Sequence, residues 1–217
     1  MSVGVFACSP SSGGGGAEES TAADSAETEA AATEGASGTA SSGEEACTDP
    51  ETMVLWAEDG EVVDPMAIAL APGLGNIGVA RSWIEGMGTL TLEFTTACDG
   101  PLYVWMMAWD RMGGEEENAD SHFITIDEGE EVEWLYGCNT PAESPGMWQW
   151  SIIESWTGDG CNHDTLELDL PAGDHSIVVR NREEGAGQNV AAIVGVVVSH
   201  DPLVDPLIYL DPADYEK

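Results

Sequence analysis

Short runs of alternating apolar and polar residues constrain the fold of this chain more than any other feature. Leu90, Leu92 and Phe94 alternate with polar neighbours, and glycine, proline, asparagine and aspartate interrupt such runs throughout. The segment 102–109 is apolar on both of its alternating faces, which is typical of a central strand covered on both sides. Helical periodicity is nearly absent, so the runs predict β-strands.

These patterns predict about nine or ten strands in roughly 150 residues, which favours two packed antiparallel sheets in an all-β sandwich. Trp105, Trp148 and Trp150 stand at alternating strand positions and are expected in the core. The expected strands lie at 53–57, 89–95, 102–109, 122–127, 132–136, 147–153, 166–170, 175–180 and 191–198.

The composition changes sharply along the chain. Residues 9–46 contain no aromatic residue, no Lys and no Arg, and consist almost entirely of Ser, Gly, Ala, Thr and Glu. Such a segment buries too little apolar surface to offset its ordering entropy, so it is expected to be a disordered acidic linker. Every tryptophan follows it, which places one domain at 47–217, large enough for a real core.

The charge balance excludes several classes of partner. The chain has 41 acidic residues and 5 basic ones, a formal net charge of −36. Nucleic acid binding requires clustered Lys and Arg, and an anionic membrane surface would repel this protein. Because salt screens such self-repulsion, the composition favours a marine or halophilic source, with simple solubility as the alternative.

The first eight residues, MSVGVFAC, resemble a bacterial lipobox in which Cys8 becomes lipid-anchored. The basic region and the apolar stretch of a full signal peptide are missing, which suggests a truncated signal with its start upstream. The alternative is an ordinary cysteine in a floppy tail. No stretch of about 18 apolar residues occurs, so no transmembrane segment is predicted, and a lipid on Cys8 would be the sole membrane attachment.

Four more cysteines, Cys47, Cys98, Cys138 and Cys161, predict two disulfides in an exported domain. Three pairings are open, of which Cys138–Cys161 with Cys47–Cys98 is favoured, since the first would close one long loop. A zinc site is the rival interpretation. It is poorly supported, because no CxxC pair exists and His163 is the only histidine near a cysteine.

Several segments, taken in order, resemble galactose-binding-like jelly-roll carbohydrate-binding modules. They are WAEDGEVVDPM from Trp56, then LYVWMMAW, NADSHFITID, MWQWSII, LPAGDHSIVVRNREEGA and SHDP. The resemblance covers about Met53 to Pro202 and implies a jelly roll that binds a glycan without catalysis. Fold alone does not fix the ligand.

The same resemblance implies a structural calcium, but the ligand pattern is incomplete. Trp56 stands where the first acidic ligand is expected, and Val194 stands where the last strand usually has an aspartate. Glu58 remains the best candidate ligand, beside Asp59 and Glu61, although calcium prefers six to eight oxygens. The alternative is that Glu58 is a solvated residue at a strand end.

Sugar sites combine an aromatic face with polar side chains that bond the hydroxyl groups. Aromatic residues near predicted loops or strand ends are candidate platforms, with core packing as the alternative for each: Trp83, Trp134, Tyr136 and Trp156. Candidate polar partners, which are otherwise turn residues or ion-pair members, are Asn76, Asn118, Asp120, Asn189, Arg180 and Arg182.

No sequence pattern indicates catalysis. There is no GxSxG, P-loop, HExxH or dinucleotide fingerprint, and acidic pairs are too frequent to be informative. We therefore expect a non-enzymatic, exported, lipid-anchored module that needs no cofactor beyond a possible calcium and binds a glycan. The alternative is a structural or adhesive protein of the cell envelope with a protein partner.

Overall fold

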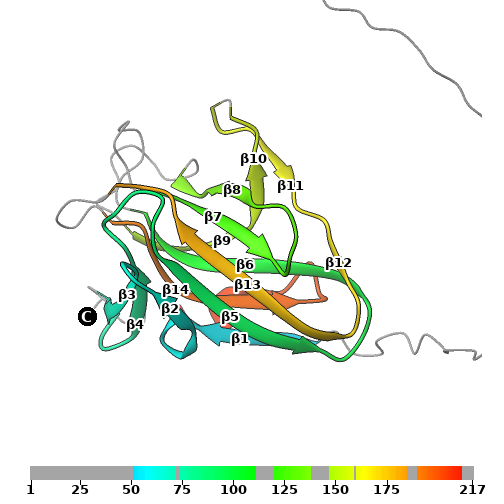
Figure 1. Cartoon of the computed structure of the whole chain (residues 1–217). Helices are drawn as coiled ribbons and strands as arrows, with labels where there is room; N and C mark the ends of the chain where they lie inside the picture. The colour runs from blue at the N-terminus through cyan, green and yellow to red at the C-terminus, as the bar shows by residue number, and fades with distance from the viewer. Residues whose placement is uncertain are drawn as a thin grey trace, which may run out of the picture. The chain divides into compact units, whose positions relative to one another are not determined.

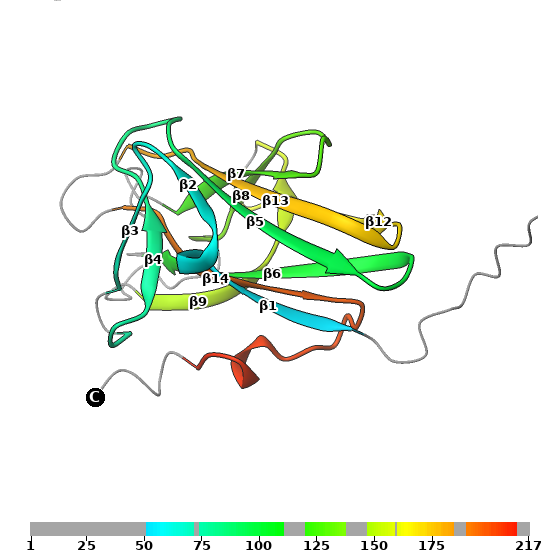
Figure 2. The same cartoon turned by 60° about the horizontal axis from the view of Figure 1, so that its bottom comes forward.

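Two antiparallel sheets face each other in this protein (Figures 1 and 2). The structure, a computed structural model, describes residues 51–71, 74–110, 120–137, 147–158, 160–184 and 190–211. Within these residues there is no α-helix, and the 3₁₀ turns η1 (Ala57–Asp59) and η3 (Pro206–Ile208) have three residues each. Residues 43–217 form one compact unit.

One sheet has seven strands in the order β12-β6-β14-β4-β3, with β1 added to β14 and β9 added to β6. Its longest strand, β6, has eleven residues and is apolar on both faces, as expected for a strand with neighbours on each side. The strands are β1 (Thr52–Trp56), β3 (Ala67–Leu70), β4 (Gly78–Arg81), β6 (Gly100–Asp110), β9 (Met147–Ile152), β12 (Leu168–Leu170) and β14 (Ala192–Ser199).

The other sheet has five strands in the order β2-β5-β13-β7-β8, and β10 and β11 form a separate hairpin. The long pair β5–β13 runs in register from Thr89↔Arg180 to Thr96↔Gly173. The strands are β2 (Glu61–Val63), β5 (Thr89–Thr96), β7 (Ser121–Ile126), β8 (Val132–Leu135) and β13 (Gly173–Asn181), with the hairpin at β10 (Glu154–Trp156) and β11 (His163–Thr165).

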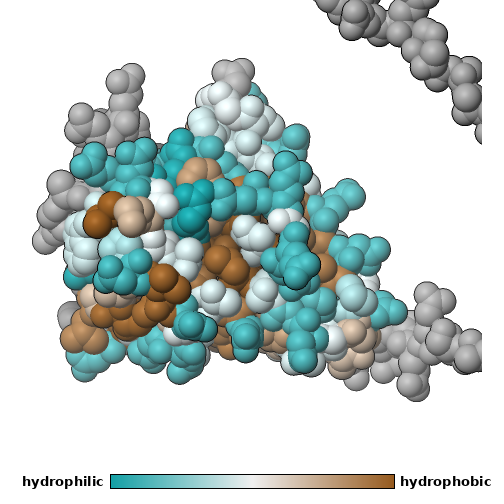
Figure 3. Space-filling model, viewed as in Figure 1, coloured by the Kyte–Doolittle hydropathy of each residue, from teal (hydrophilic) through white to brown (hydrophobic). Residues whose placement is uncertain are grey.

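The chain passes repeatedly from one sheet to the other, as in a jelly roll, so the predicted two-sheet antiparallel β-sandwich is confirmed. Alternate residues of β5, β6 and β13 meet between the sheets, where Leu92, Met106 and Ile177 belong to one buried cluster. Hydrophilic residues cover much of the face in Figure 3, and apolar surface shows around β3 and β4 and in the middle of the face.

Fourteen strands occur in the described residues, more than the nine or ten predicted. The unpredicted ones, such as β2, β3 and β11, have three or four residues each. Runs this short show too little alternation to be recognised.

Of the cysteines, Cys98 and Cys161 are both disulfide-bonded. Cys47 and Cys138 lie outside the described residues, so the favoured pairing stays a prediction. Cys8 and the expected linker 9–46 also lie outside them.

Candidate functional site

The outward face of the seven-stranded sheet carries most of the tryptophans. In β6 the residues Leu102, Val104 and Met106 point into the core, so by alternation Trp105 and Trp109 face outward. Five of the eight tryptophans share this face: Trp56, Trp105, Trp109, Trp148 and Trp150.

Strand register sets these side chains next to one another. In the β6–β9 pair, Trp109 lies opposite Trp148 and Met107 lies opposite Trp150. The rings of Trp109 and Trp148 are 5.1 Å apart at 58°, a tilted arrangement that aromatic pairs favour. Trp148 is buried, whereas Trp150 is only half-buried.

A glycine permits one part of this arrangement. Gly195 in β14 lies opposite Trp56, and a Cβ at Gly195 would come within 3.2 Å of the Trp56 ring and 2.8 Å of the Leu55 carbonyl oxygen. The indole of Trp56 therefore lies against bare backbone, which only glycine provides.

The C-terminal segment covers part of the same face, beneath the sheet in Figure 2. Trp150 Nε1 donates a hydrogen bond of 2.9 Å to the carbonyl oxygen of Leu210, whose side chain is buried in the outward-face cluster. Asp205 caps η3 by accepting from the Leu207 amide at 3.0 Å. These contacts hold residues 202–211 as the second wall of a groove.

The groove between β6, β9 and this segment has a volume of about 750 Å³. Trp105 and Trp150 are half-buried and line it, so their aromatic surfaces remain partly accessible. The remaining lining is contributed by Met147, Trp148, Gln149, Ser151, Ile152, Pro202, Asp205, Pro206, Leu207 and Asp211.

The charged side chains that line the groove are carboxylates, which accept hydrogen bonds, and not basic side chains. Asp205 and Asp211 line it, while no Lys, Arg or His does so among the described residues. The Gln149 side chain turns away, since its Nε2 donates to the Tyr136 carbonyl at 3.0 Å. An uncharged ligand with an apolar face and hydroxyl groups matches this chemistry, whereas a carboxylated or phosphorylated ligand would meet two carboxylates.

The prediction that Trp134 and Tyr136 are sugar-binding platforms is wrong. Trp134 and Tyr136 are 1% and 2% exposed and pack in the core between the sheets. Trp134 Nε1 donates to the Ile152 carbonyl at 3.0 Å, and the Tyr136 hydroxyl lies 3.3 Å from the Trp109 carbonyl. The alternation of VEWLY sets both rings on the same face of the strand but is compatible with either face of the sheet. The sequence alone therefore did not show that these rings point inward.

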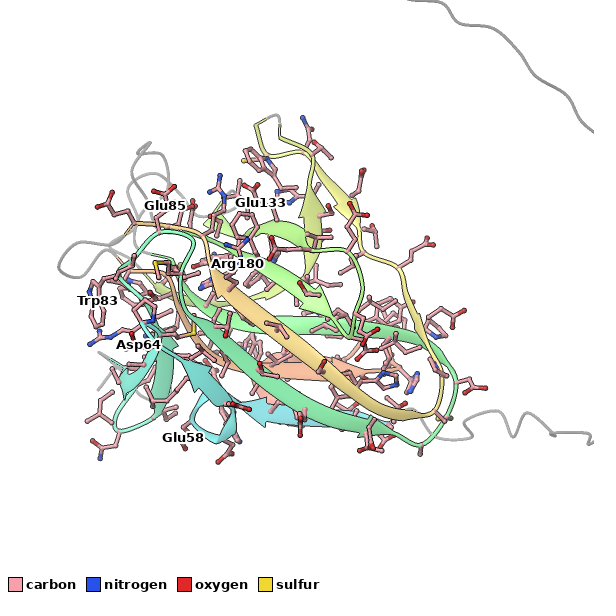
Figure 4. All side chains as sticks on the ribbon, in the orientation of Figure 1. Glu58, Asp64, Trp83, Glu85, Glu133 and Arg180 are labelled. Atoms are coloured by element: carbon pink, nitrogen blue, oxygen red, sulfur yellow. The ribbon has the colours of Figure 1, made fainter. Side chains whose placement is uncertain are left out.

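The other two aromatic candidates lie outside the groove. Trp83 is 38% exposed and stacks with Arg81, whose guanidinium carbon is 4.5 Å from its ring centre (Figure 4). Trp156, in the β10–β11 hairpin, is half-buried and donates to the Gly160 carbonyl at 2.7 Å. Neither has the second wall that Trp150 has in the groove.

The two candidate arginines are engaged in ion pairs, the alternative role considered for them. Arg180 binds Glu131 through Nε at 2.9 Å and Nη2 at 2.5 Å, and lies over the Phe123 ring. Arg182 binds Glu133 at 2.6 Å and also contacts Glu183.

The remaining candidate polar residues do not come together in one binding site. Asn76 is exposed, and Asp120 packs beside Gly137, where its carboxylate leaves no room for a Cβ. Neither lines the groove. Asn118 and Asn189 lie outside the described residues.

The core prediction for three tryptophans holds in part. Trp148 is buried, but Trp105 and Trp150, also expected in the core, form the groove wall. The accessibility of Trp150 depends on a C-terminal segment distant in sequence, since its bonding partner Leu210 is 60 residues away. The one available signal was that LYVWMMAW is apolar on both faces, so one face had to lie outside the main core.

The residues around Glu58 do not fit a calcium site. Glu58 Oε2 accepts a hydrogen bond of 3.1 Å from the Gly78 amide (Figure 4), which accounts for one of its oxygens. No group of three or more His, Cys, Asp or Glu suited to a metal occurs in the part of the chain that the structure describes. Calcium needs six to eight oxygens, so no function here is derived from it.

Two buried histidines, His122 and His175, have pKa values that are shifted in opposite directions. Burial lowers the pKa of His122 from 6.5 to about 3, and neither ring nitrogen has a hydrogen-bond partner in the described structure. His175 is also desolvated, but its hydrogen bonds to Asp127 and to the Pro171 carbonyl, each 2.8 Å, raise its pKa overall.

Among the described residues, no helix is long and apolar enough to span a membrane.

Comparison with known proteins gave similarities in structure only. No protein-family model and no curated protein matches the sequence. A family 35 carbohydrate-binding module from Clostridium thermocellum aligns with a TM-score of 0.46 and 14% identity over 68% of this chain and 98% of its own. A CBM35 from Cellvibrio japonicus aligns with 0.45 and 11% over 68% and 92%.

The exo-β-1,3-galactanase from Phanerochaete chrysosporium, solved with galactose, aligns with a TM-score of 0.45 and 14% identity. The aligned region covers 68% of this chain but only 29% of the galactanase. Similarity at this level says nothing about what the groove binds, so the ligand has to be inferred from the groove itself.

Proposed function

We propose that this domain is a non-catalytic binding module that holds an uncharged glycan in the groove between β9 and the C-terminal segment. The observation that carries the proposal is the pair of half-buried tryptophans, Trp105 and Trp150, in the groove wall. A pyranose ring has an apolar face that stacks on indole and an edge of hydroxyl groups that need acceptors and donors.

The size and charge of the groove support this class of ligand. Its volume of about 750 Å³ lies within the 300–1,000 Å³ typical of small-ligand sites. The carboxylates of Asp205 and Asp211 line the groove and are acceptors of the kind that sugar hydroxyl groups bind.

The fixed acidic rim selects against anionic sugars. At a net charge of −36, a uronate or sulfated glycan would be repelled both by the rim and by the whole surface. Binding should therefore come from stacking and neutral hydrogen bonds, and it should change little with salt.

The test is calorimetric titration of a panel of neutral oligosaccharides into the full chain at high salt. Trp105→Ala should weaken binding at least tenfold, equivalent to about 1.4 kcal/mol, by removing one stacking face. Trp83→Ala is the matched control, because Trp83 is exposed but lies outside the groove. Equal loss in both variants, or no binding across diverse neutral glycans, would refute the proposal.

We further propose that the protein lies outside the cell, anchored through a lipid on Cys8, with disulfides Cys47–Cys98 and Cys138–Cys161 and a surface adapted to salt. Mass spectrometry of the native protein would detect the lipid, and non-reducing peptide mapping would give the pairing.

The alternative, an envelope protein with a protein partner, predicts a flat apolar interface rather than a groove. The groove, with Trp105 and Trp150 in one wall, favours the glycan.

A further inference from the structure

β3 (Ala67–Leu70) is an edge strand without the usual protection. It pairs with β4 and, within the described residues, with no strand on its other side. Edge strands in natural proteins usually carry a lysine, a proline or a bulge that prevents pairing with another chain. The sequence AIAL has none of these, and no charge.

Apolar side chains surround this edge. Ile68 and Leu70 on β3 are 39% and 63% exposed, and Val63 at the end of β2 is 53% exposed. Figure 3 shows the apolar surface gathered over this part of the domain. We call Val63, Ile68 and Leu70 with the β3 backbone the edge patch; most monomeric surfaces do not combine an open strand edge with exposed large apolar residues.

The charge around the edge patch is unlike that of the rest of the chain. Residues 65–84 contain no Asp or Glu, in a protein with 41 of them, and Asp64 and Glu85 border this stretch. The single charge within it is Arg81, on β4 opposite Ala67. Arg180 and Arg182 are in ion pairs, whereas no carboxylate lies within ion-pair distance of Arg81 in the described structure.

A second copy of this chain is the partner that these features favour. Two molecules of charge −36 repel each other wherever carboxylates would meet. The strand of the edge patch carries no charge of its own and is complementary to itself when two copies run antiparallel. The Glu58 carboxylate lies beside it but is bonded to the Gly78 amide. A basic partner would instead be drawn to the acidic surface elsewhere.

We propose that two copies associate by pairing β3 with β3 antiparallel, in a two-fold symmetric contact that joins their seven-stranded sheets. Ile68 and Leu70 of each copy are then covered by the other, and the open backbone groups of β3 are satisfied. Four-residue strands give a small interface, so the dimer is weak, with a dissociation constant on the order of 10 µM.

The symmetry has a consequence that rests on the proposed function. A two-fold axis that pairs two edge strands antiparallel stands perpendicular to the joined sheet. Both outward faces, and with them both grooves, then open on the same side. One dimer could therefore hold two sites on the same polymer, which raises the apparent affinity without any new contact.

Sedimentation of the full chain without glycan tests the association separately from ligand binding. At about 2 M NaCl, where the −36 charge is screened, the wild type should show a concentration-dependent dimer that weakens at about 0.1 M NaCl. Leu70→Lys should weaken it at least tenfold. Leu203→Lys, at an apolar residue that is 86% exposed away from the edge patch, is the matched control and should dimerise like wild type.

Amide hydrogen exchange on the wild type gives a readout that needs no variant. Protection of the amides of residues 67–70 should rise with protein concentration at high salt, while protection of β13 should not change. A chain that stays monomeric at high salt and high concentration would overturn the proposal. So would a dimer that Leu70→Lys leaves intact, one that salt dissociates, or one without added protection on β3.

Discussion

His122 should make the stability of this domain fall steeply in mild acid. The side chain is fully buried, its ring lies 5.8 Å from that of Tyr136 and 6.3 Å from that of Trp134, and no described group bonds either nitrogen. Because burial penalises the charged form, its pKa is about 3 in the folded protein against 6.5 in the unfolded chain.

The sign follows from which state binds the proton. Above pH 6.5 the imidazole is neutral in both states and the pKa difference costs nothing. Between pH 6.5 and 3 the unfolded chain is protonated at His122 and the folded protein is not, so stability decreases as the pH falls. Each pH unit removes up to about 1.4 kcal/mol, and the full 3.5-unit difference amounts to about 5 kcal/mol.

That loss is comparable with the whole stability of a typical domain, about 5–15 kcal/mol. The assay is urea unfolding of wild type and His122→Phe at constant high salt, from pH 7 to pH 4. Phenylalanine keeps an aromatic ring beside Trp134 and Tyr136 but cannot titrate, although its larger volume shifts stability by a constant amount.

The difference in unfolding free energy between the two proteins isolates His122, because the carboxylates contribute equally to both. From pH 6.5 to 4.5 this difference should change by about 2.3 kcal/mol in favour of the variant, since His122 is only half protonated in the unfolded chain at pH 6.5. Parallel pH profiles for the two proteins would refute the reasoning and mean that the folded protein accepts a proton on His122.

Three further outcomes are expected. His175→Gln should show the opposite pH dependence to His122→Phe. The raised pKa of His175 stabilises the fold below pH 6.5, and this stabilisation is lost as the pH rises through the folded pKa. The variant's loss of unfolding free energy, measured by urea unfolding, should therefore be larger at pH 5.5 than at pH 8.5. Gly195→Ala should cost about 1–3 kcal/mol in the same assay, because its Cβ meets the Leu55 carbonyl at 2.8 Å and the Trp56 ring at 3.2 Å. Trp134→Ala should cost about 3–5 kcal/mol, since it empties a core site, and an exposed-tryptophan response to quencher would contradict its burial.

The strands that sequence predicted well are those with long, one-sided alternation. From β5, Leu90, Leu92 and Phe94 face the core between the two sheets, and the predicted run 89–95 is nearly the whole observed strand. The predicted run 166–170 alternates over five residues, although only Leu168–Leu170 form the strand β12. Where alternation covers five or more residues, the period of two is enough to fix both the element and its buried face.

Local pattern could not predict which aromatic rings are accessible. In β8 the alternation sets Trp134 and Tyr136 on one side but does not say which side is inward, since both faces are partly apolar. In β9 the accessibility of Trp150 depends on Leu210, and in β14 the placement of Trp56 depends on Gly195. These are contacts between residues distant in sequence, which periodicity does not encode.

The groove and the edge patch, the two interaction surfaces that we propose, share one property. On an outer surface with a net charge of −36, association through opposite charges is restricted to cationic partners and is lost at high salt. The groove presents tryptophan faces and the edge patch presents Ile68 and Leu70, so both act through apolar contact and hydrogen bonds. Salt strengthens the burial of apolar surface while it screens the repulsion between carboxylates. Glycan binding should therefore persist, and self-association should increase, under the conditions in which most protein contacts based on charge dissociate.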